Sequence, residues 1–102
     1  MYTPVFVKSE NELNKIIKQQ KRSHTEVSIL FTSLWDPFCK EVVSLLKKAQ
    51  KGGKKVYVVN SFTMPHAFVI YKTTKLPHLV TLRGRSVESI DYLPLVYQTL
   101  GL

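Results

Sequence analysis

The feature that most constrains the fold is a pair of short apolar segments with a helical pattern between them. Residues 27–33 and 56–59 are continuous and rich in β-branched side chains, which is typical of strands buried on both faces of a sheet. Residues 41–48 place apolar side chains at helical spacing. A strand, a helix and a second strand in this order predict a right-handed parallel crossover. The chain is therefore predicted to form an α/β fold.

Further strands and a further helix are expected on both sides of this unit. Residues 3–8 are β-prone, and residues 62–72 predict a short helix with a proline in its first turn. Residues 78–82 resume as a strand, and Gly84 supplies a tight turn after it. Residues 86–90 are therefore expected to pair back antiparallel.

Two more helices are indicated by capping residues. Ser9 with Glu12 three places later forms a capping-box pattern, which predicts a helix that ends near residues 21–23. Asp91 is expected to cap the last helix, which carries Pro94 in its first turn.

Size and composition favour one domain that spans residues 1–102. The hydrophobic content of 44% is typical of a globular chain, and no apolar run approaches the roughly 18 residues of a membrane span. The N-terminal segment lacks the basic start and apolar core of a secretory signal. A single cysteine, Cys39, excludes an internal disulfide and fits a reducing compartment. We therefore expect a soluble, cytoplasmic protein.

A basic balance favours an acidic partner. Lysine and arginine total 15 against 7 acidic residues, which gives a net charge of +8. The densest basic patch comprises Lys47, Lys48, Lys51, Lys54 and Lys55. We favour a role for these lysines in complementing a helix dipole and solvating a loop, whereas nucleic-acid binding through the patch is an alternative that lacks the usual interleaved aromatics.

The hexapeptide Trp35-Asp36-Pro37-Phe38-Cys39-Lys40 lies where the first apolar strand passes into the next helix. A helix N-terminus favours a thiolate, whereas a neighbouring carboxylate disfavours one. Asp36 is interpreted first as the helix N-cap, with Pro37 at the first helical position.

The order β, α, β, α, β and then α, β, β, α, with Trp-x-x-x-Cys-Lys after the central strand, resembles the thioredoxin family. An x-Pro before an antiparallel hairpin, Leu76-Pro77, extends the resemblance over nearly the whole chain. The turn is also similar to the Cys-Pro-aromatic-Cys turn of glutaredoxins. The resemblance implies a thioredoxin-like fold, with a central mixed β-sheet flanked by helices on both faces. It also implies that Pro77 is cis and lies beside the Trp35 turn, where the family binds extended polypeptide through its backbone.

The likeness breaks at the positions that carry the family's chemistry. Asp36 stands where the attacking cysteine is found, and Cys39 matches the resolving cysteine. Since a carboxylate cannot attack a disulfide, this chain cannot run a dithiol cycle. Leu30 replaces a buried carboxylate that accepts a proton in thioredoxins, and Ser44 replaces a helix-kinking proline. The active-site motif is therefore degenerate.

Three functional hypotheses follow. The preferred one is a redox-degenerate module that binds a protein or peptide partner, and its binding residues are Trp35, Asp36, Pro37, Phe38, Leu76 and Pro77. The second is a monothiol oxidoreductase acting through Cys39, with His78 as its partner and Asp36 as the orienting group. The third is a nucleic-acid-binding accessory protein that uses the basic patch.

No cofactor is expected, and no metal either, because the three histidines and one cysteine are too widely spaced to form a local ligand pattern.

Overall fold

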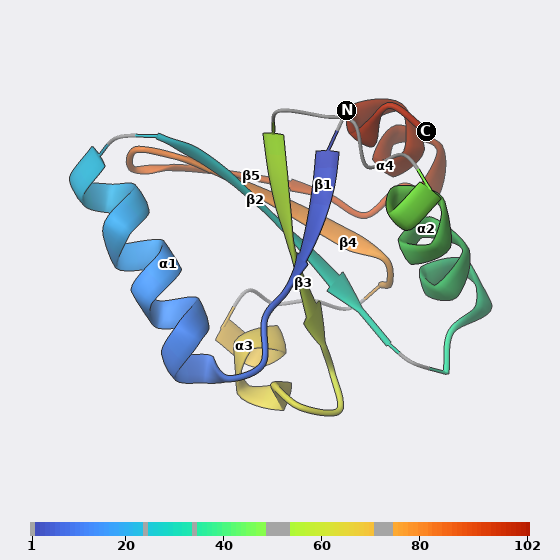
Figure 1. The fold of residues 1–102 in the computed structure, drawn as a ribbon, viewed down its shortest axis with the longest axis horizontal. Coiled ribbons are helices and arrows are strands. Elements are labelled where there is room, and N and C mark those ends of the chain that lie inside the picture. The colour runs from blue at the N-terminus through green and yellow to red at the C-terminus, as the bar shows by residue number, and fades with distance from the viewer. Residues whose placement is uncertain (1, 24, 34, 49–53, 71–74) are drawn as a thin grey trace.

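The computed structural model describes residues 2–23, 25–33, 35–48, 54–70 and 75–102, and these form a mixed sheet with helices on both faces (Figure 1). The elements in chain order are β1 (Tyr2–Phe6), α1 (Glu10–Ser23), β2 (Glu26–Thr32), α2 (Pro37–Lys48), β3 (Lys54–Asn60), α3 (Pro65–Ile70), β4 (His78–Arg83), β5 (Ser86–Ile90) and α4 (Leu93–Leu100). The strand order across the sheet is β1-β3-β2-β4-β5. The predicted α/β class and the mixed sheet between helices are confirmed.

The predicted crossover lies at the centre of the sheet. β2 and β3 pair in parallel, from Ser28 opposite Val56 to Thr32 opposite Asn60, and α2 connects them. β1 extends the parallel part on the outer edge of β3, whereas β4 runs antiparallel to β2 and β5 antiparallel to β4. β2 thus has a neighbouring strand on each side. Its residues 28–32 are buried, which agrees with the burial on both faces that the apolar run at residues 27–33 predicts.

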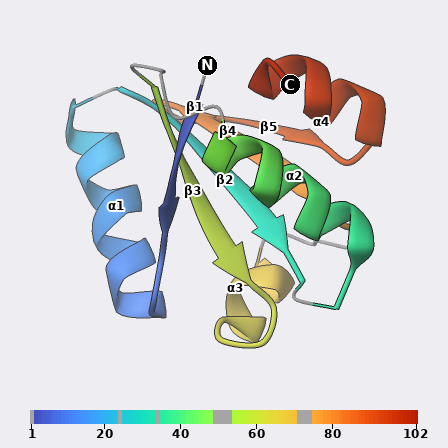
Figure 2. The same ribbon diagram turned by 45° about the vertical axis from the view of Figure 1, so that its right-hand side comes forward.

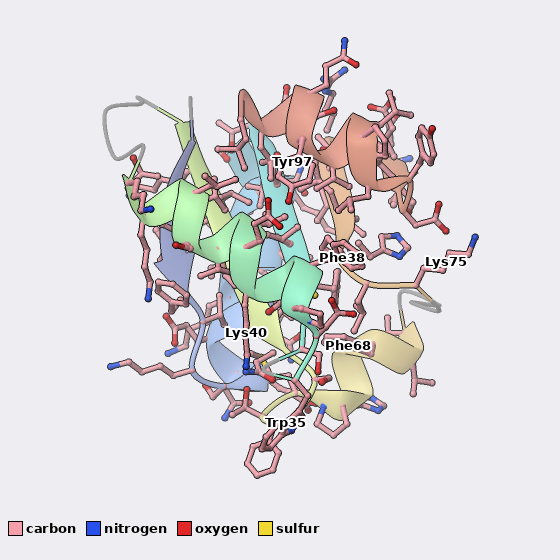
Figure 3. The ribbon with its side chains drawn as sticks, turned by 90° about the vertical axis from the view of Figure 1, so that its right-hand side faces the viewer. Trp35, Phe38, Lys40, Phe68, Lys75 and Tyr97 are labelled. Atoms are coloured by element: carbon pink, nitrogen blue, oxygen red, sulfur yellow. The ribbon has the colours of Figure 1, made fainter. Side chains whose placement is uncertain are left out.

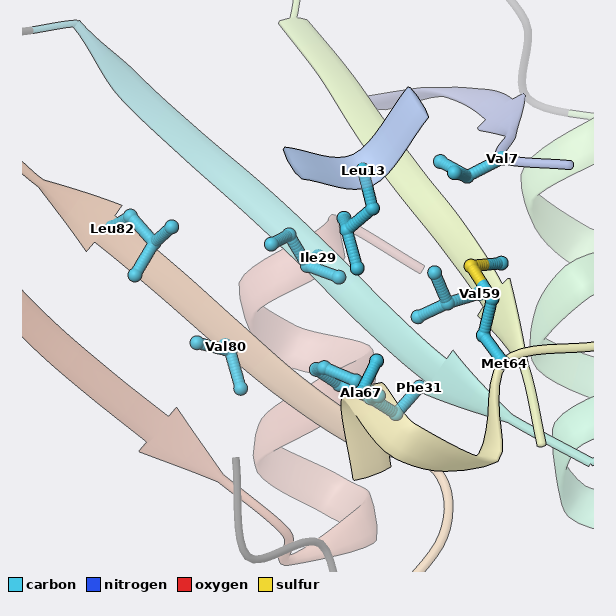
Figure 4. Packing of buried hydrophobic residues seen from close by; sticks show 9 residues of the cluster. All are labelled: Val7, Leu13, Ile29, Phe31, Val59, Met64, Ala67, Val80 and Leu82. Atoms are coloured by element: carbon cyan, nitrogen blue, oxygen red, sulfur yellow. The ribbon is translucent and has the colours of Figure 1, made fainter. Parts of the chain in front are cut away.

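Successive residues of β2 alternate between two hydrophobic cores. Ile29 and Phe31 face the core under α1 and α3, whose buried residues are Val7, Leu13, Ile29, Phe31, Val59, Met64, Ala67, Val80 and Leu82 (Figure 4). Leu30 faces the opposite core, under α2 and α4, whose buried residues are Leu30, Val42, Leu46, Val56, Leu79, Val96 and Leu100. Figure 2 shows these two helices together on one side of the sheet. The period of two along the strand therefore explains why both faces carry helices.

The start of α1 agrees with the predicted capping box. The backbone N–H of Glu12 donates to Ser9 Oγ at 3.2 Å, and the backbone N–H of Lys8 donates to Glu12 Oε2 at 3.1 Å. In a usual capping box the carboxylate accepts the N–H of the N-cap residue, here Ser9, whereas Glu12 accepts the N–H of the residue before it. The helix begins at Glu10 and ends at Ser23.

The two later helices carry the predicted proline in the first turn, but one predicted cap is wrong. The helix predicted within residues 62–72 begins at Pro65, after a turn in which Phe62 N–H donates to Asn60 Oδ1 at 2.9 Å. Residues 71–72 lie outside the described part of the chain. Asp91 does not cap α4: the N-cap is Tyr92, which makes no side-chain cap bond, so Asp91 lies one residue too early.

No helix in the described ranges has both the length and the apolar character needed to cross a membrane.

Candidate functional site

Asp36 fixes the turn between β2 and α2. Its Oδ1 accepts the backbone N–H of Phe38 at 2.8 Å and that of Cys39 at 3.2 Å, and its carbonyl oxygen accepts the backbone N–H of Lys40 at 3.1 Å. α2 begins at the next residue, Pro37. The predicted N-cap is therefore confirmed, and the carboxylate is bound to the helix it starts.

Cys39 points into the protein. The residue is 1% exposed, and burial is the main reason why the pKa of its thiol rises from 9.0 to about 11. A hydrogen bond with the Ser33 backbone lowers the pKa in part, whereas the negative charge of Asp36 raises it further. The sequence leaves open whether the helix N-terminus, which favours the thiolate, outweighs the Asp36 carboxylate, which disfavours it. In the structure burial has the largest effect, and it disfavours the thiolate. The thiol is protonated at neutral pH.

His78 is buried at the first position of β4 and is 6% exposed. Among the described residues neither of its ring nitrogens has a hydrogen-bond partner, and the ring lies edge-on to Phe31 with centroids 6.1 Å apart. Burial lowers its pKa from 6.5, and the nearby charge of Asp91 raises it in part. The carboxylate that acts on His78 is thus Asp91, whereas Asp36 is engaged at the helix start. The catalytic roles of Cys39 and His78 stay predictions.

Three aromatic side chains are exposed at the end of the sheet where β2 and β3 end. Trp35 is 82% exposed, Phe38 52% and Phe62 75%, and Figure 3 shows Trp35 extending away from the body of the protein. The backbone N–H of Ser61 donates to the carbonyl of Thr32 at 3.0 Å, which holds the turn after β3 against the end of β2. We call Trp35, Phe38 and Phe62 the aromatic surface.

Phe62 is not among the predicted site residues, because residues 62–72 are expected to form a helix. The signal for an exposed side chain here is Asn60, which favours a turn and accepts the Phe62 N–H at the end of β3.

The Leu76-Pro77 loop enters the sheet at this end. The peptide bond between these two residues is cis, Pro77 is buried and Leu76 is partly buried against the core under α1 and α3. The next residue, His78, pairs with Phe31 in the penultimate position of β2. The loop and the Trp35 turn therefore lie at the same end of β2.

The basic patch is only partly within the described structure. Lys47, Lys48 and Lys55 are exposed, and Lys47 Nζ lies 5.2 Å from the centroid of the Phe6 ring. Lys51 and the side chain of Lys54 lie outside the described part. The patch as a whole stays a prediction.

No three or more His, Cys, Asp or Glu side chains in the described ranges are grouped so as to hold a metal ion.

The comparisons with known proteins place the chain by its shape. No family model matches the sequence, and no curated protein does. Thioredoxin O2 from Arabidopsis thaliana superposes with a TM-score of 0.77 at 18% identity, covering 97% of this chain and 92% of that one. Thioredoxin NaTrxh from Nicotiana alata gives 0.80 at 12% identity, with 97% and 90% covered. Schistosoma mansoni thioredoxin gives 0.78 at 16% identity, with 97% and 94% covered.

These likenesses establish a thioredoxin-like fold over nearly the whole chain. A shared fold does not by itself assign a reaction, so the function has to be argued from the site.

Proposed function

We propose that this thioredoxin-like protein is a redox-degenerate module that binds an extended segment of a protein partner. The binding surface comprises the turn from Trp35 to Cys39 and the Leu76-Pro77 loop. The observation that carries the proposal is that the aromatic side chains of this turn are exposed whereas its thiol is not. Trp35 and Phe38 are exposed, but Cys39 is 1% exposed and its pKa is raised to about 11.

The aromatic surface has the chemistry of an interface anchor. Its three side chains are large and exposed at one end of the sheet, and aromatic residues supply much of the binding energy at protein interfaces. The cap bonds to Asp36 fix the backbone from Asp36 to Cys39, the segment that presents Phe38. A preorganised turn loses less conformational entropy on binding, which favours affinity.

The residues inside the site argue against thiol exchange as the main activity. Exchange requires a thiolate that can reach a disulfide, and Cys39 is both buried and protonated at neutral pH. Leu30, at the position where thioredoxins carry a buried acid, is fully enclosed in the core under α2 and α4. A monothiol reaction would therefore need the helix start to open first.

The proposal is tested by selecting displayed random peptides on the immobilised protein. Peptides that bind the wild type are then measured against the double variant Trp35→Ser/Phe38→Ser and against Cys39→Ala. We expect the aromatic double variant to lose at least about 30-fold in affinity, the loss typical of an interface anchor. Cys39→Ala is expected to bind like the wild type.

A matched control uses an exposed apolar side chain at the other end of the sheet. Val87 is 60% exposed on β5 and lies opposite Leu82, which pairs with Val27 near the start of β2, and Val87→Ser is expected to leave affinity unchanged. Binding that survives the Trp35 and Phe38 replacements, or that requires Cys39, would overturn the proposal. Thermal melting of each variant verifies that the fold is retained.

A further inference from the structure

A pocket of about 560 Å³ opens between α2 and the edge of the sheet formed by β1 and β3. Phe6 and Val58 from the strands and Val43 from the helix give it mainly apolar walls, and Cys39, in the first turn of α2, is also among the lining residues. Its size lies within the range of about 300 to 1,000 Å³ typical of small-molecule pockets. The space is therefore sufficient for an apolar group of moderate size.

The charged residues of this pocket all carry one sign. Lys8, Lys40 and Lys47 line it, and no lining residue in the described part of the chain bears a carboxylate. Lys47 lies over the Phe6 ring, which places its ammonium group against an apolar wall. Figure 3 shows Lys40 on the first turns of α2. An anion at the opening would thus meet several cations while its apolar part contacts the walls.

Neutral donors accompany the lysines. Ser44 and Asn60 also line the pocket, and their hydroxyl and amide groups can donate to an oxygen ligand. The net charge of +8 adds a long-range attraction for anions. The same charge disfavours an amphipathic cation, so the lining selects the sign of the ligand as well as its apolar body.

We propose that this pocket binds a small organic anion with an apolar body, of the class of a medium-chain carboxylate. The hydrocarbon part lies between Val43, Val58 and Phe6, and the carboxylate lies at the lysine rim. This site is separate in its chemistry from the aromatic surface, which carries no lysine, and the inference holds independently of the proposed protein partner.

The experiment titrates the protein with decanoate below its micelle concentration and follows backbone amide shifts by NMR. Decanol and decyltrimethylammonium are the matched neutral and cationic probes. We expect saturable shifts for pocket residues such as Val43, Val58 and Ser44, with decanoate the tightest ligand of the three. Binding is also expected to slow alkylation of Cys39, the only cysteine, since its side chain lines the pocket.

Two variants separate charge from shape. Lys40→Glu/Lys47→Glu is expected to lower the affinity for decanoate by about tenfold or more, since two favourable charge contacts become unfavourable. Its matched control is Lys15→Glu/Lys18→Glu, which changes the net charge equally at exposed positions of α1 and is expected to bind normally. Ser44→Trp fills the opening from an exposed position and is expected to abolish binding, whereas Gln19→Trp on α1 is expected to have no effect.

Three results would overturn the inference. One is equal affinity for decanoate and decanol, and another is equal weakening by the two charge-reversal pairs. The third is a pattern of shifts confined to Trp35, Phe38 and Phe62, which would place the ligand on the aromatic surface instead. None of these results bears on peptide binding by that surface, so failure here is distinguishable from failure of the proposed function.

Discussion

Cys39 and His78 are buried residues whose pKa values are displaced in opposite directions for one physical reason. Burial penalises the charged form of each, so the thiol keeps its proton and the imidazole loses it. Both groups are therefore neutral near pH 7. Two predictions follow at the scale of these side chains, one for reactivity and one for stability.

Alkylation of Cys39 by iodoacetamide is expected to be slow near neutral pH and to accelerate about tenfold per pH unit toward the thiol pKa of about 11. The reason is that only the thiolate reacts, and burial keeps its share small. The measurement is the alkylation rate between about pH 7 and pH 10, followed by mass spectrometry. The control is the same rate in denaturant. A native thiol that reacts as fast as the unfolded one at neutral pH would contradict this and favour the monothiol function.

His78 is expected to make the protein less stable in acid. Because its pKa in the folded state lies below 6.5, the unfolded chain binds the additional proton first as the pH falls. Its contribution to the free energy of unfolding is thus full above 6.5 and is lost progressively as the pH falls below that value. Urea unfolding at a series of pH values measures the effect in the wild type and in His78→Leu.

The His78→Leu variant should show a shallower loss of stability below pH 6.5 than the wild type. Asp91→Asn should show a steeper one, because the Asp91 charge raises the pKa of His78. His66→Leu removes an exposed histidine and is the matched control. Parallel pH profiles for the wild type and His78→Leu would show that His78 does not titrate as described.

Helix α2 contacts the core, the Asp36 turn and the pocket. Val42 and Leu46 face the core, its first turn is bound by Asp36, and Val43 and Lys47 line the pocket beside β1. Loosening its first turn would therefore disturb the candidate binding turn as well as the fold.

Asp36→Ala is expected to lower the free energy of unfolding by about 1 kcal/mol, since it removes the acceptor of two backbone N–H groups. Asp36→Asn keeps an oxygen acceptor and is expected to lose less. Chemical denaturation measures both. If Asp36→Ala had the same free energy of unfolding as the wild type, the cap bonds would contribute no stability. The argument that the turn is preorganised for binding would then lose its basis.

The accuracy of the element predictions followed the kind of signal that each used. The strand of residues 27–33 and the capping box at Ser9 were recognised because hydrophobic periodicity and local hydrogen bonds are written in adjacent residues. The N-cap of α4 was predicted at Asp91 but lies at Tyr92, because Tyr92 makes no side-chain cap bond that the sequence could signal. Propensity alone places the capping residue one or more positions away.

The whole molecule presents two separate surfaces that share one helix. The aromatic surface lies at the end of the sheet where β2 ends. The pocket lies beside it, between α2 and the edge where β1 pairs with β3, and reaches Thr32 and Asn60 at the ends of β2 and β3. We expect their ligands to bind independently, because no residue of the aromatic surface lines the pocket in the described part of the chain.

Trp35→Ser/Phe38→Ser is accordingly expected to leave decanoate affinity unchanged within about twofold, because neither side chain lines the pocket. Saturating decanoate is likewise expected to leave peptide affinity unchanged. Titration calorimetry measures both directions. A reciprocal change in the two affinities would instead demonstrate coupling through α2.

The amino-acid sequence was sufficient for the α/β class, the parallel crossover and the loss of a dithiol cycle, because these depend on local periodicity and on which side chains are present. It did not decide that Cys39 is buried, that Phe62 is exposed at the same end of the sheet as Trp35 and Phe38, or that three lysines line one apolar pocket. Desolvation and proximity between separate elements arise only when the chain packs. The chemistry available to this protein was thus set by its residues, and its placement inside or outside by the tertiary structure.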